Sequence, residues 1–196
     1  MVWDPQEQGQ VIFSCFHPDN DRLIGHAPNQ ELNNGVNKLV ELDLETGELS
    51  DLITRVGGAN FGLYSPDGSL IAFRTMETGS PELHLYNPAT GEETLVSTIP
   101  VQGYRWIDDE EVGRQLVFWD PAMTVRRIPV ESEADGSISI GDPYESPFKY
   151  TGNIAFALDL KGVAYSIQDG VNDGPPEHLV VIDHWADSVT STDATP

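Results

Sequence analysis

The chain is poor in basic residues, and this shortage excludes two classes of partner. Only 10 of its 196 residues are Lys or Arg, against 32 Asp or Glu, so the formal net charge is −22. Proteins that bind nucleic acid neutralise phosphates with a basic stripe, and anionic membrane surfaces attract the same kind of segment. We therefore expect no nucleic-acid partner. One interpretation of the acidity is that it attracts a basic partner. The simpler interpretation is that the charge only keeps the protein soluble.

Long apolar runs and cysteines are also scarce. No run approaches the roughly 20 apolar residues that span a bilayer, so we expect no membrane insertion. The start, MVWDPQEQGQ, has neither the basic nor the apolar region of a signal peptide, which leaves a cytoplasmic or a periplasmic location open. Cys15 is the single cysteine. Because it lies in the apolar run VIFSCF, we expect a buried, inert thiol.

A helical pattern is absent as well, and short strand patterns repeat along the chain in its place. Each repeat unit pairs an aromatic-ended strand with an acidic turn and a second apolar strand. Four such segments recur at intervals of about 40 to 50 residues, a period that is typical of propeller blades when only β signals are present. They read FHPDNDRLIG (16–25), YSPDGSLIAF (64–73), WIDDEEVGRQLVF (106–118) and FALDLKGVAYS (156–166).

The turns within the repeat have the residues that tight turns require. Ser65 opens one turn, Pro66 sets φ at its second position and Gly68 closes it. A second pair of hairpins, KLVELDLETGELSDLI (38–53) and ELHLYNPATGEETLVS (82–97), ends its turns with Thr-Gly. Glycine there favours the left-handed conformation that closes a hairpin. The sequence thus predicts an all-β chain.

The hairpin SPDGSLIAF followed by ELHLYNPATGE resembles the WD40-like repeat of TolB-type β-propeller proteins. This repeat also occurs in propeller domains of prolyl-oligopeptidase-type peptidases. The resemblance implies a β-propeller of about four four-stranded blades, whereas members of that family close with six or seven. Three arrangements stay open: a closed four-bladed ring, part of a larger propeller, or blades completed by association.

The predicted organisation has three parts. An N-terminal extension covers residues 1–9, and a polar tail covers 188–196. The blades between them occupy approximately residues 10–53, 59–97, 101–141 and 151–187.

No catalytic constellation is recognisable. The chain has no Gly-x-Ser-x-Gly elbow of a serine hydrolase, and its five histidines have no zinc-type spacing. The segment DGVNDG (169–174) resembles a calcium loop, but Val171 falls where a ligand is needed, which favours a plain turn. We expect no catalytic residue, no metal site and no cofactor.

The candidate binding residues are polar and lie in the three longest predicted loops, 27–37, 141–150 and 169–177. Propellers bind partners through loops between the second and third strands and between blades. The first and last of these loops belong to blades that become neighbours if the ring closes. The candidates are Asn29, Gln30, Asn33, Asn34, Tyr144, Asp169, Asn172 and Asp173.

These features favour a non-enzymatic binding or assembly module, a rigid acidic platform for a protein partner. Self-association is a further alternative for how such a module assembles. The competing hypothesis is the gating or substrate-binding propeller of a larger peptidase-like hydrolase, or a sugar-binding protein. Aromatic residues on the first strand of each predicted blade, such as Phe13, Phe61 and Tyr64, are explained mainly by packing between sheets.

Overall fold

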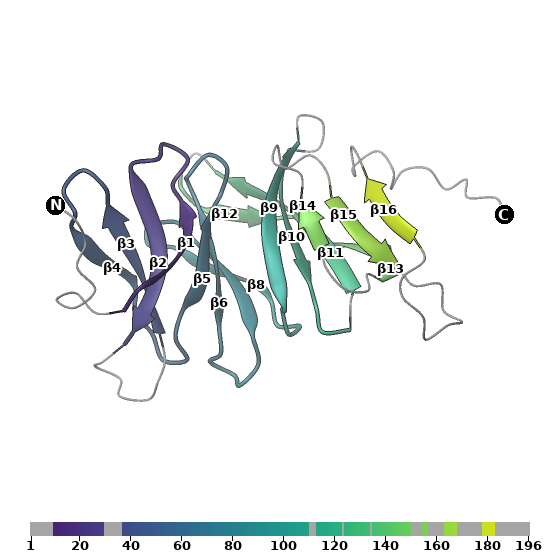
Figure 1. Ribbon diagram of the computed structural model, residues 1–196, viewed down its shortest axis with the longest axis horizontal. Coiled ribbons are helices and arrows are strands. Elements are labelled where there is room, and N and C mark those ends of the chain that lie inside the picture. The colour runs from purple at the N-terminus through teal and green to yellow at the C-terminus, as the bar shows by residue number, and fades with distance from the viewer. Residues whose placement is uncertain are drawn as a thin grey trace. The chain divides into compact units, whose positions relative to one another are not determined.

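The computed structural model describes residues 10–29, 37–109, 113–122, 124–133, 135–149, 154–156, 163–167 and 178–182 (Figure 1). Every regular element in this part of the chain is a β-strand, as the sequence predicted. It contains no helix that is long and apolar enough to cross a membrane. Two compact units are present: Met1–Val101 with Glu131–Ser139, and Gln102–Val130 with Ile140–Pro196.

The first unit holds two four-stranded antiparallel sheets, each a simple meander. The strands of the first sheet, in order, are β1 (Ile12–Phe16), β2 (Arg22–Pro28), β3 (Asn37–Asp43) and β4 (Leu49–Ile53). Those of the second are β5 (Asn60–Tyr64), β6 (Ile71–Thr75), β7 (Glu82–Tyr86) and β8 (Glu93–Ser97). Strand β5 packs against β1, β2 and β3, so these two sheets lie side by side (Figure 1).

The third sheet has five strands rather than the expected four. Its strands are β9 (Gly103–Asp109), β10 (Gly113–Trp119), β11 (Thr124–Ser132), β12 (Ile138–Ile140) and β13 (Tyr144–Lys149). The last sheet is described with three strands, β14 (Ile154–Phe156), β15 (Val163–Ile167) and β16 (His178–Ile182).

Strand β13 corrects the prediction of a loop over residues 141–150. It pairs antiparallel with β11. Arg126 on β11 binds Glu145, with Nη2 2.9 Å from Oε2, and the guanidinium of Arg127 lies 4.8 Å from the ring centroid of Tyr144. These cross-strand contacts hold a segment whose Gly, Pro and polar residues had suggested a loop.

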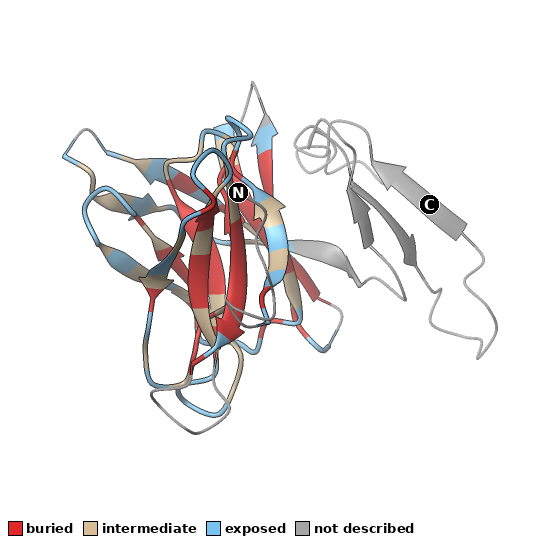
Figure 2. Cartoon of the chain, turned by 60° about the vertical axis from the view of Figure 1, so that its left-hand side comes forward, coloured by how far each residue is buried: buried red, intermediate tan, exposed pale blue. Residues whose placement is uncertain are grey.

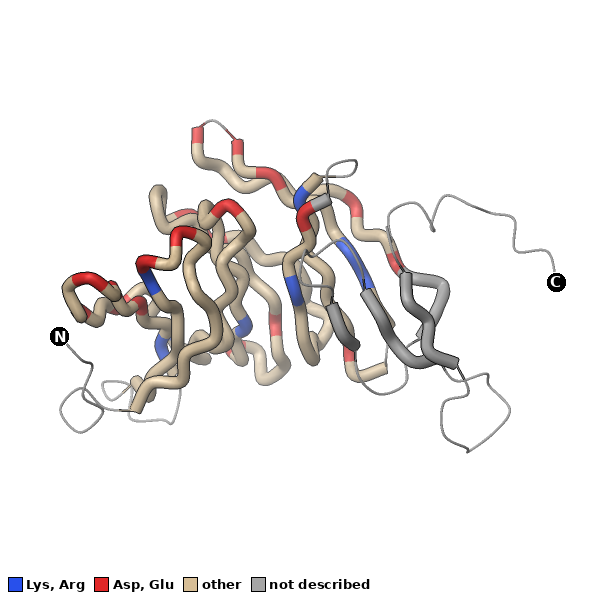
Figure 3. The backbone as a smooth tube through the Cα atoms, turned by 45° about the horizontal axis from the view of Figure 1, so that its top comes forward, with Lys and Arg blue, Asp and Glu red and all other residues tan. Residues whose placement is uncertain are grey.

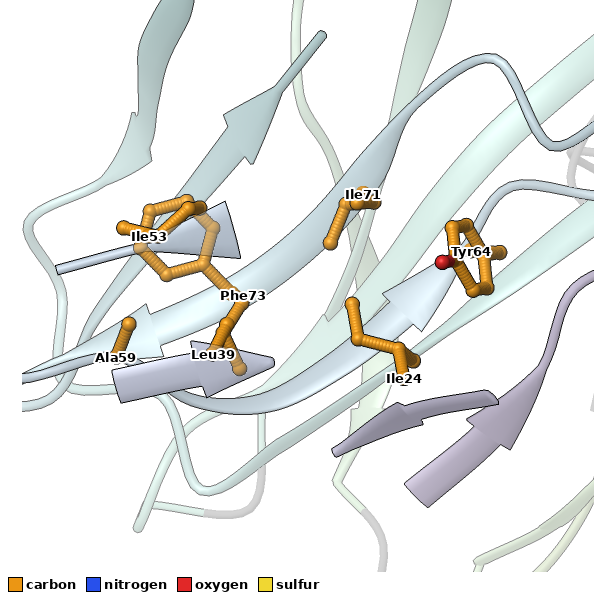
Figure 4. Packing of buried hydrophobic residues seen from close by; sticks show 7 residues of the cluster. All are labelled: Ile24, Leu39, Ile53, Ala59, Tyr64, Ile71 and Phe73. Carbon is orange, nitrogen blue, oxygen red and sulfur yellow. The ribbon is translucent and has the colours of Figure 1, made fainter. Parts of the chain in front are cut away.

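The core of the first unit lies between its two sheets. Phe73 and Ile71 on β6 are fully buried against Ile24 and Leu39 of the first sheet (Figure 4). Buried positions follow the strands, and exposed ones follow the turns (Figure 2). Full burial of one such side chain is worth about 1.5–3 kcal/mol, so the seam between the sheets stabilises this unit.

The expectation for Cys15 is wrong in part. Its side chain is half-buried and packs against the edge of the core between the sheets. The register of β1 with β2 shifts between Phe13 and Cys15. This bulge turns the thiol away from full burial, because an extra residue changes which face the following side chains occupy.

Candidate functional site

The meander places four turns at one end of the two sheets in the first unit. In each sheet, one turn joins the first strand to the second and another joins the third to the fourth. We call the end of the sheets where these turns lie the turn end. The four turns are residues 17–21, 44–48, 65–70 and 87–92. The opposite, interblade end carries the connection from β4 to β5 and the loop from β6 to β7. Acidic residues gather on the turns, as Figure 3 shows in red.

The β1–β2 turn is built around a buried histidine. His17 takes the place that Ser65 has in the β5–β6 turn, since the backbone N–H of His17 donates to the carbonyl of Arg22 as that of Ser65 donates to the carbonyl of Leu70. Arg22 donates from Nη2 to Nε2 of His17 over 2.9 Å. The other ring nitrogen, Nδ1, lies 3.2 Å from the backbone N–H of Asp19 and 3.5 and 3.4 Å from the carboxylates of Asp19 and Asp21.

The β3–β4 turn is fixed by a carboxylate. Asp43 Oδ1 accepts the backbone N–H groups of Glu45 and Thr46 and the hydroxyl of Thr46. These bonds hold the pKa of Asp43 below its ordinary value. In the β5–β6 turn, Asp67 accepts the hydroxyls of Ser65 and Ser69 in the same way. The turns are therefore rigid supports for their exposed neighbours.

Three of these turns adjoin one another. The backbone N–H of Leu44 donates to the carbonyl of Asp21 over 2.8 Å, which ties the β3–β4 turn to the β1–β2 turn. Gly68 lies so close to His17 that an added Cβ would be 2.3 Å from Nε2. The β5–β6 turn thus abuts the β1–β2 turn, and their side chains form one continuous surface.

That surface carries a concentrated negative charge, and we call its exposed carboxylates the acidic face. Arg22 is the one Lys or Arg side chain on the four turns and the strand positions next to them. It is already engaged, by Asp21 at 3.2 Å and Glu41 at 3.6 Å. The acidic face consists of Asp19, Asp21, Glu45, Glu48 and Asp67.

A polar contact holds the two sheets together beneath the acidic face. The hydroxyl of Tyr64 on β5 donates to Glu41 on β3, and its ring meets that of His17 edge-on, with centroids 4.9 Å apart. Burial and the neighbouring Glu41 raise the pKa of Tyr64 well above its ordinary value. Tyr64 is therefore a neutral hydrogen-bond donor at all physiological pH values.

The structure brings His17, Asp19 and Asp21 together with ligand atoms within 4.8 Å of one another. The sequence analysis missed this cluster, although a His in the place of a Ser within a repeat was a signal for it. The Arg22 guanidinium faces Nε2 and the backbone N–H of Asp19 faces Nδ1, so both ring nitrogens are already engaged within the turn. The cluster is best explained as a self-contained polar network that holds the turn together.

The predicted binding residues are only partly within the described chain. Asn29 follows β2 at the interblade end of the first unit and is buried. Tyr144 begins β13 in the second unit, beneath the Arg127 guanidinium. The other six lie outside the described residues: Gln30, Asn33, Asn34, Asp169, Asn172 and Asp173.

Phe61 marks the interblade end with an unusual backbone. Its φ is +57°, a left-handed value that is rare for a bulky residue, and the register of β5 shifts here. The residue is 45% exposed, and its ring contacts that of His26 with centroids 5.1 Å apart and lies 4.7 Å from the Arg74 guanidinium carbon. The expectation that Phe61 packs between sheets is therefore only half correct.

Comparison with solved structures identifies the architecture. The β-propeller domain of Cps50 (Swd1) from Myceliophteria thermophila matches with a TM-score of 0.54 and 14% identity, over 86% of this chain and 55% of that one. TolB from Acinetobacter baumannii matches with a TM-score of 0.51 and 17% identity, over 82% and 38%. The chain is built from β-propeller blades. The predicted resemblance to TolB-type and WD40-like propellers is thus confirmed for the fold.

The Dos1 propeller gives a similar match, with a TM-score of 0.52 and 11% identity, over 78% of this chain and 38% of that one. The chain therefore spans between about two fifths and just over half of the propellers it matches. No protein-family model and no curated protein matches the sequence. At these identities the likeness concerns the fold, which fits a protein-interaction module in general terms.

Proposed function

We propose that the chain is a protein-binding propeller module that acts by complementarity rather than by catalysis. The observation that carries this proposal is the acidic face, five exposed carboxylates on three adjoining turns that are fixed by internal hydrogen bonds. A rigid surface loses little conformational entropy on binding. Its partner presents a basic surface, because the negative field of this end speeds encounter with positive charge.

Exposed apolar side chains lie among the turns that carry the acidic face. Phe16, at the end of β1, is 57% exposed, and Leu44 in the β3–β4 turn is 42% exposed. Interfaces gain most of their affinity from such large apolar contacts, while charges mainly set specificity and association rate. The partner surface is therefore expected to combine basic side chains with an apolar patch.

The experiment compares two variants that lose the same charge. Glu45→Gln/Glu48→Gln removes two carboxylates of the acidic face, and Glu131→Gln/Asp142→Asn removes two exposed carboxylates elsewhere. The immobilised wild-type chain captures its partner at low salt, and association and dissociation rates are then measured for each variant over a series of salt concentrations.

The proposal predicts slower association for the acidic-face variant at low salt and similar rates for both variants at high salt, where charges are screened. Equal capture by the two variants would contradict the acidic face as the binding surface. Turnover of a peptide or ester by the purified chain, abolished by one Ser or Asp substitution, would overturn the non-enzymatic assignment.

A further inference from the structure

The interblade end of the first unit carries a surface that the proposed function does not use. Five of the eight large apolar side chains that the described residues expose lie there, against two at the turn end. Each of the five stands in a connection at this end or at the first or second position of a strand that begins there. They are Ile12, Val56, Phe61, Met76 and Ile99, with 42–65% of each residue exposed. Exposed apolar groups that gather in one place mark a protein interface.

Backbone hydrogen bonds join three connections at this end into one continuous surface. These connections are residues 54–59, 76–81 and 98–101. The N–H of Met76 donates to the carbonyl of Gly57 over 3.1 Å, which ties the first connection to the second. The N–H of Val101 donates to the carbonyl of Pro81 over 3.0 Å, which ties the second to the third. The exposed side chains of all three therefore belong to one surface.

Phe61 extends this surface toward β1 and adds a strained aromatic residue to it. Its ring contacts His26, which pairs with Ile12 across β1 and β2. The guanidinium of Arg74 lies over the ring and donates to the carbonyl of Val101 over 3.3 Å, so it links Phe61 to the β8–β9 connection. A left-handed φ is unfavourable for a bulky residue, and such strain clusters at binding surfaces. Because the ring stays exposed, burial within one chain does not compensate for this strain.

Charge divides the first unit into two unlike ends. The four turns at the turn end contain six carboxylates and no Lys or Arg. The three connections at the interblade end contain one carboxylate, Glu77, and one basic residue, Arg55, and these two side chains pair with each other. These connections thus have no net charge, in a chain whose net charge is −22. A second copy meets far less repulsion at this end than at the turn end.

We propose that a second copy of this chain covers the interblade end through a twofold contact, to which both copies contribute the same surface. The three connections, with Ile12 and Phe61, provide about 20 residues, which is the share that one partner gives to an interface of standard size. This contact buries the neutral, apolar ends of the two first units against each other. It also leaves the two acidic faces at opposite ends of the pair, where their like charges are far apart.

The pair has a consequence that rests on the proposed function. Because the turn end takes no part in the twofold contact, both acidic faces stay open to a basic partner. A partner with two basic surfaces then binds the pair more tightly than it binds one chain, since the second contact forms within the same complex.

The test measures the mass of the full chain by sedimentation equilibrium over a range of protein concentrations at one high salt concentration. Val56→Ser/Met76→Ser removes two exposed apolar side chains of the interblade end. Phe16→Ser/Leu44→Ser is the matched control, because it removes two exposed apolar side chains of the turn end. Both double variants keep the charge of the chain, so a difference between them reports the position of the contact.

We expect dimers of the wild type and of Phe16→Ser/Leu44→Ser with the same dissociation constant, and a constant at least about tenfold weaker for Val56→Ser/Met76→Ser. Equal constants for the two double variants, or a loss in Phe16→Ser/Leu44→Ser alone, would overturn the proposal. Growth beyond the dimer would contradict a closed twofold contact. A wild type that stays monomeric at every concentration would also overturn it, and would leave the apolar surface to a different protein.

Hydrogen exchange of the wild type tests the same contact without a substitution. We expect the backbone amides of 54–59, 76–81 and 98–101 to exchange more slowly in concentrated than in dilute solution, and those of 44–48 and 65–70 to stay unchanged. Exchange at the connections that does not depend on concentration would contradict the twofold contact. Neither measurement involves a basic partner, so failure of the dimer and failure of the proposed function are separate outcomes.

Discussion

At the scale of single residues, two glycines offer a matched comparison of backbone strain and contact. Gly68 and Gly91 both have left-handed φ values, +74° and +77°, and each closes a turn by donating its N–H to the residue that opens it. The two differ in their surroundings. An added Cβ at Gly68 would meet the His17 ring at 2.3 Å, whereas nothing lies within 4 Å of one at Gly91.

Gly91→Val should therefore cost about 1–2 kcal/mol in the free energy of unfolding, because the side chain disfavours the left-handed conformation. Gly68→Val should cost clearly more, since it also pushes His17 away from Arg22. Denaturant unfolding of both variants measures the difference. Equal losses would mean that the contact between the β5–β6 turn and His17 contributes nothing, and no loss in either variant would contradict the turn assignments.

The residues that form these turns could be predicted, because Pro, Asp and Gly act through local backbone preferences. The environments of Phe61 and His17 could not. Phe61 departs from the pattern of its strand through a bulge, and His17 gains its role from Arg22 and from a turn in the next sheet. Such contacts depend on which segments meet in space, and turn chemistry does not encode that.

At the scale of elements, the contact between Tyr64 and Glu41 joins β5 of one sheet to β3 of the other. Tyr64→Phe leaves the half-buried Glu41 carboxylate without this donor, so we expect a loss of about 1–3 kcal/mol in the free energy of unfolding. A double-mutant cycle with Glu41→Gln isolates the coupling between the strands. Tyr86→Phe, at a half-buried tyrosine of the same sheet, is the control.

Additive effects of Tyr64→Phe and Glu41→Gln would contradict a direct bond between the sheets. A coupling energy near zero, together with an equal loss in Tyr86→Phe, would show that the Tyr64 hydroxyl is no more important than an ordinary surface contact.

Buried histidines make the stability of the two sheets depend on pH. Burial lowers the pKa of His26 on β2 and of His84 on β7 below the ordinary value of about 6.5. Above that pH, both imidazole rings are neutral in the folded chain and in the unfolded chain. As the pH falls below about 6.5, the unfolded chain takes up protons that the folded chain resists, so the free energy of unfolding decreases toward the lower folded pKa.

We therefore expect the wild type to lose stability between pH 7 and pH 5, by up to about 1.4 kcal/mol per pH unit for each histidine. His26→Gln should show a shallower loss, and His26→Gln/His84→Gln a shallower one still. Urea unfolding over this pH range, with a chelator present, measures the slopes. Parallel curves for wild type and variants would show that other groups cause the pH dependence.

The strands of the first three sheets follow the sequence pattern closely, with β13 as the instructive exception. Apolar alternation and turn residues mark strands whose side chains pack on a core. Strand β13 is held instead by pairing with β11 and by the contacts of Glu145 and Tyr144 with Arg126 and Arg127. A strand that forms through long-range polar contacts leaves no periodic apolar signal in its own sequence.

At the scale of the whole molecule, the repeat period of about 40 to 50 residues was enough to predict propeller blades, because one period holds a four-strand meander, as the first two sheets show. The period says nothing about how many blades complete a ring. This chain matches between 38% and 55% of the length of three solved propellers. The described residues also expose large apolar side chains, including Phe16, Val56 and Phe61 at 57%, 65% and 45%.

Those apolar side chains and the net charge of −22 act in opposite directions on self-association. Repulsion between like-charged copies dominates at low salt and weakens as salt shortens the screening length, while apolar contacts persist. We therefore predict a mass in solution that rises above the 21.5 kDa of one chain as salt increases, measured by light scattering after size exclusion. A constant 21.5 kDa at every salt concentration would contradict self-association and direct attention to a different protein as the partner of the acidic face.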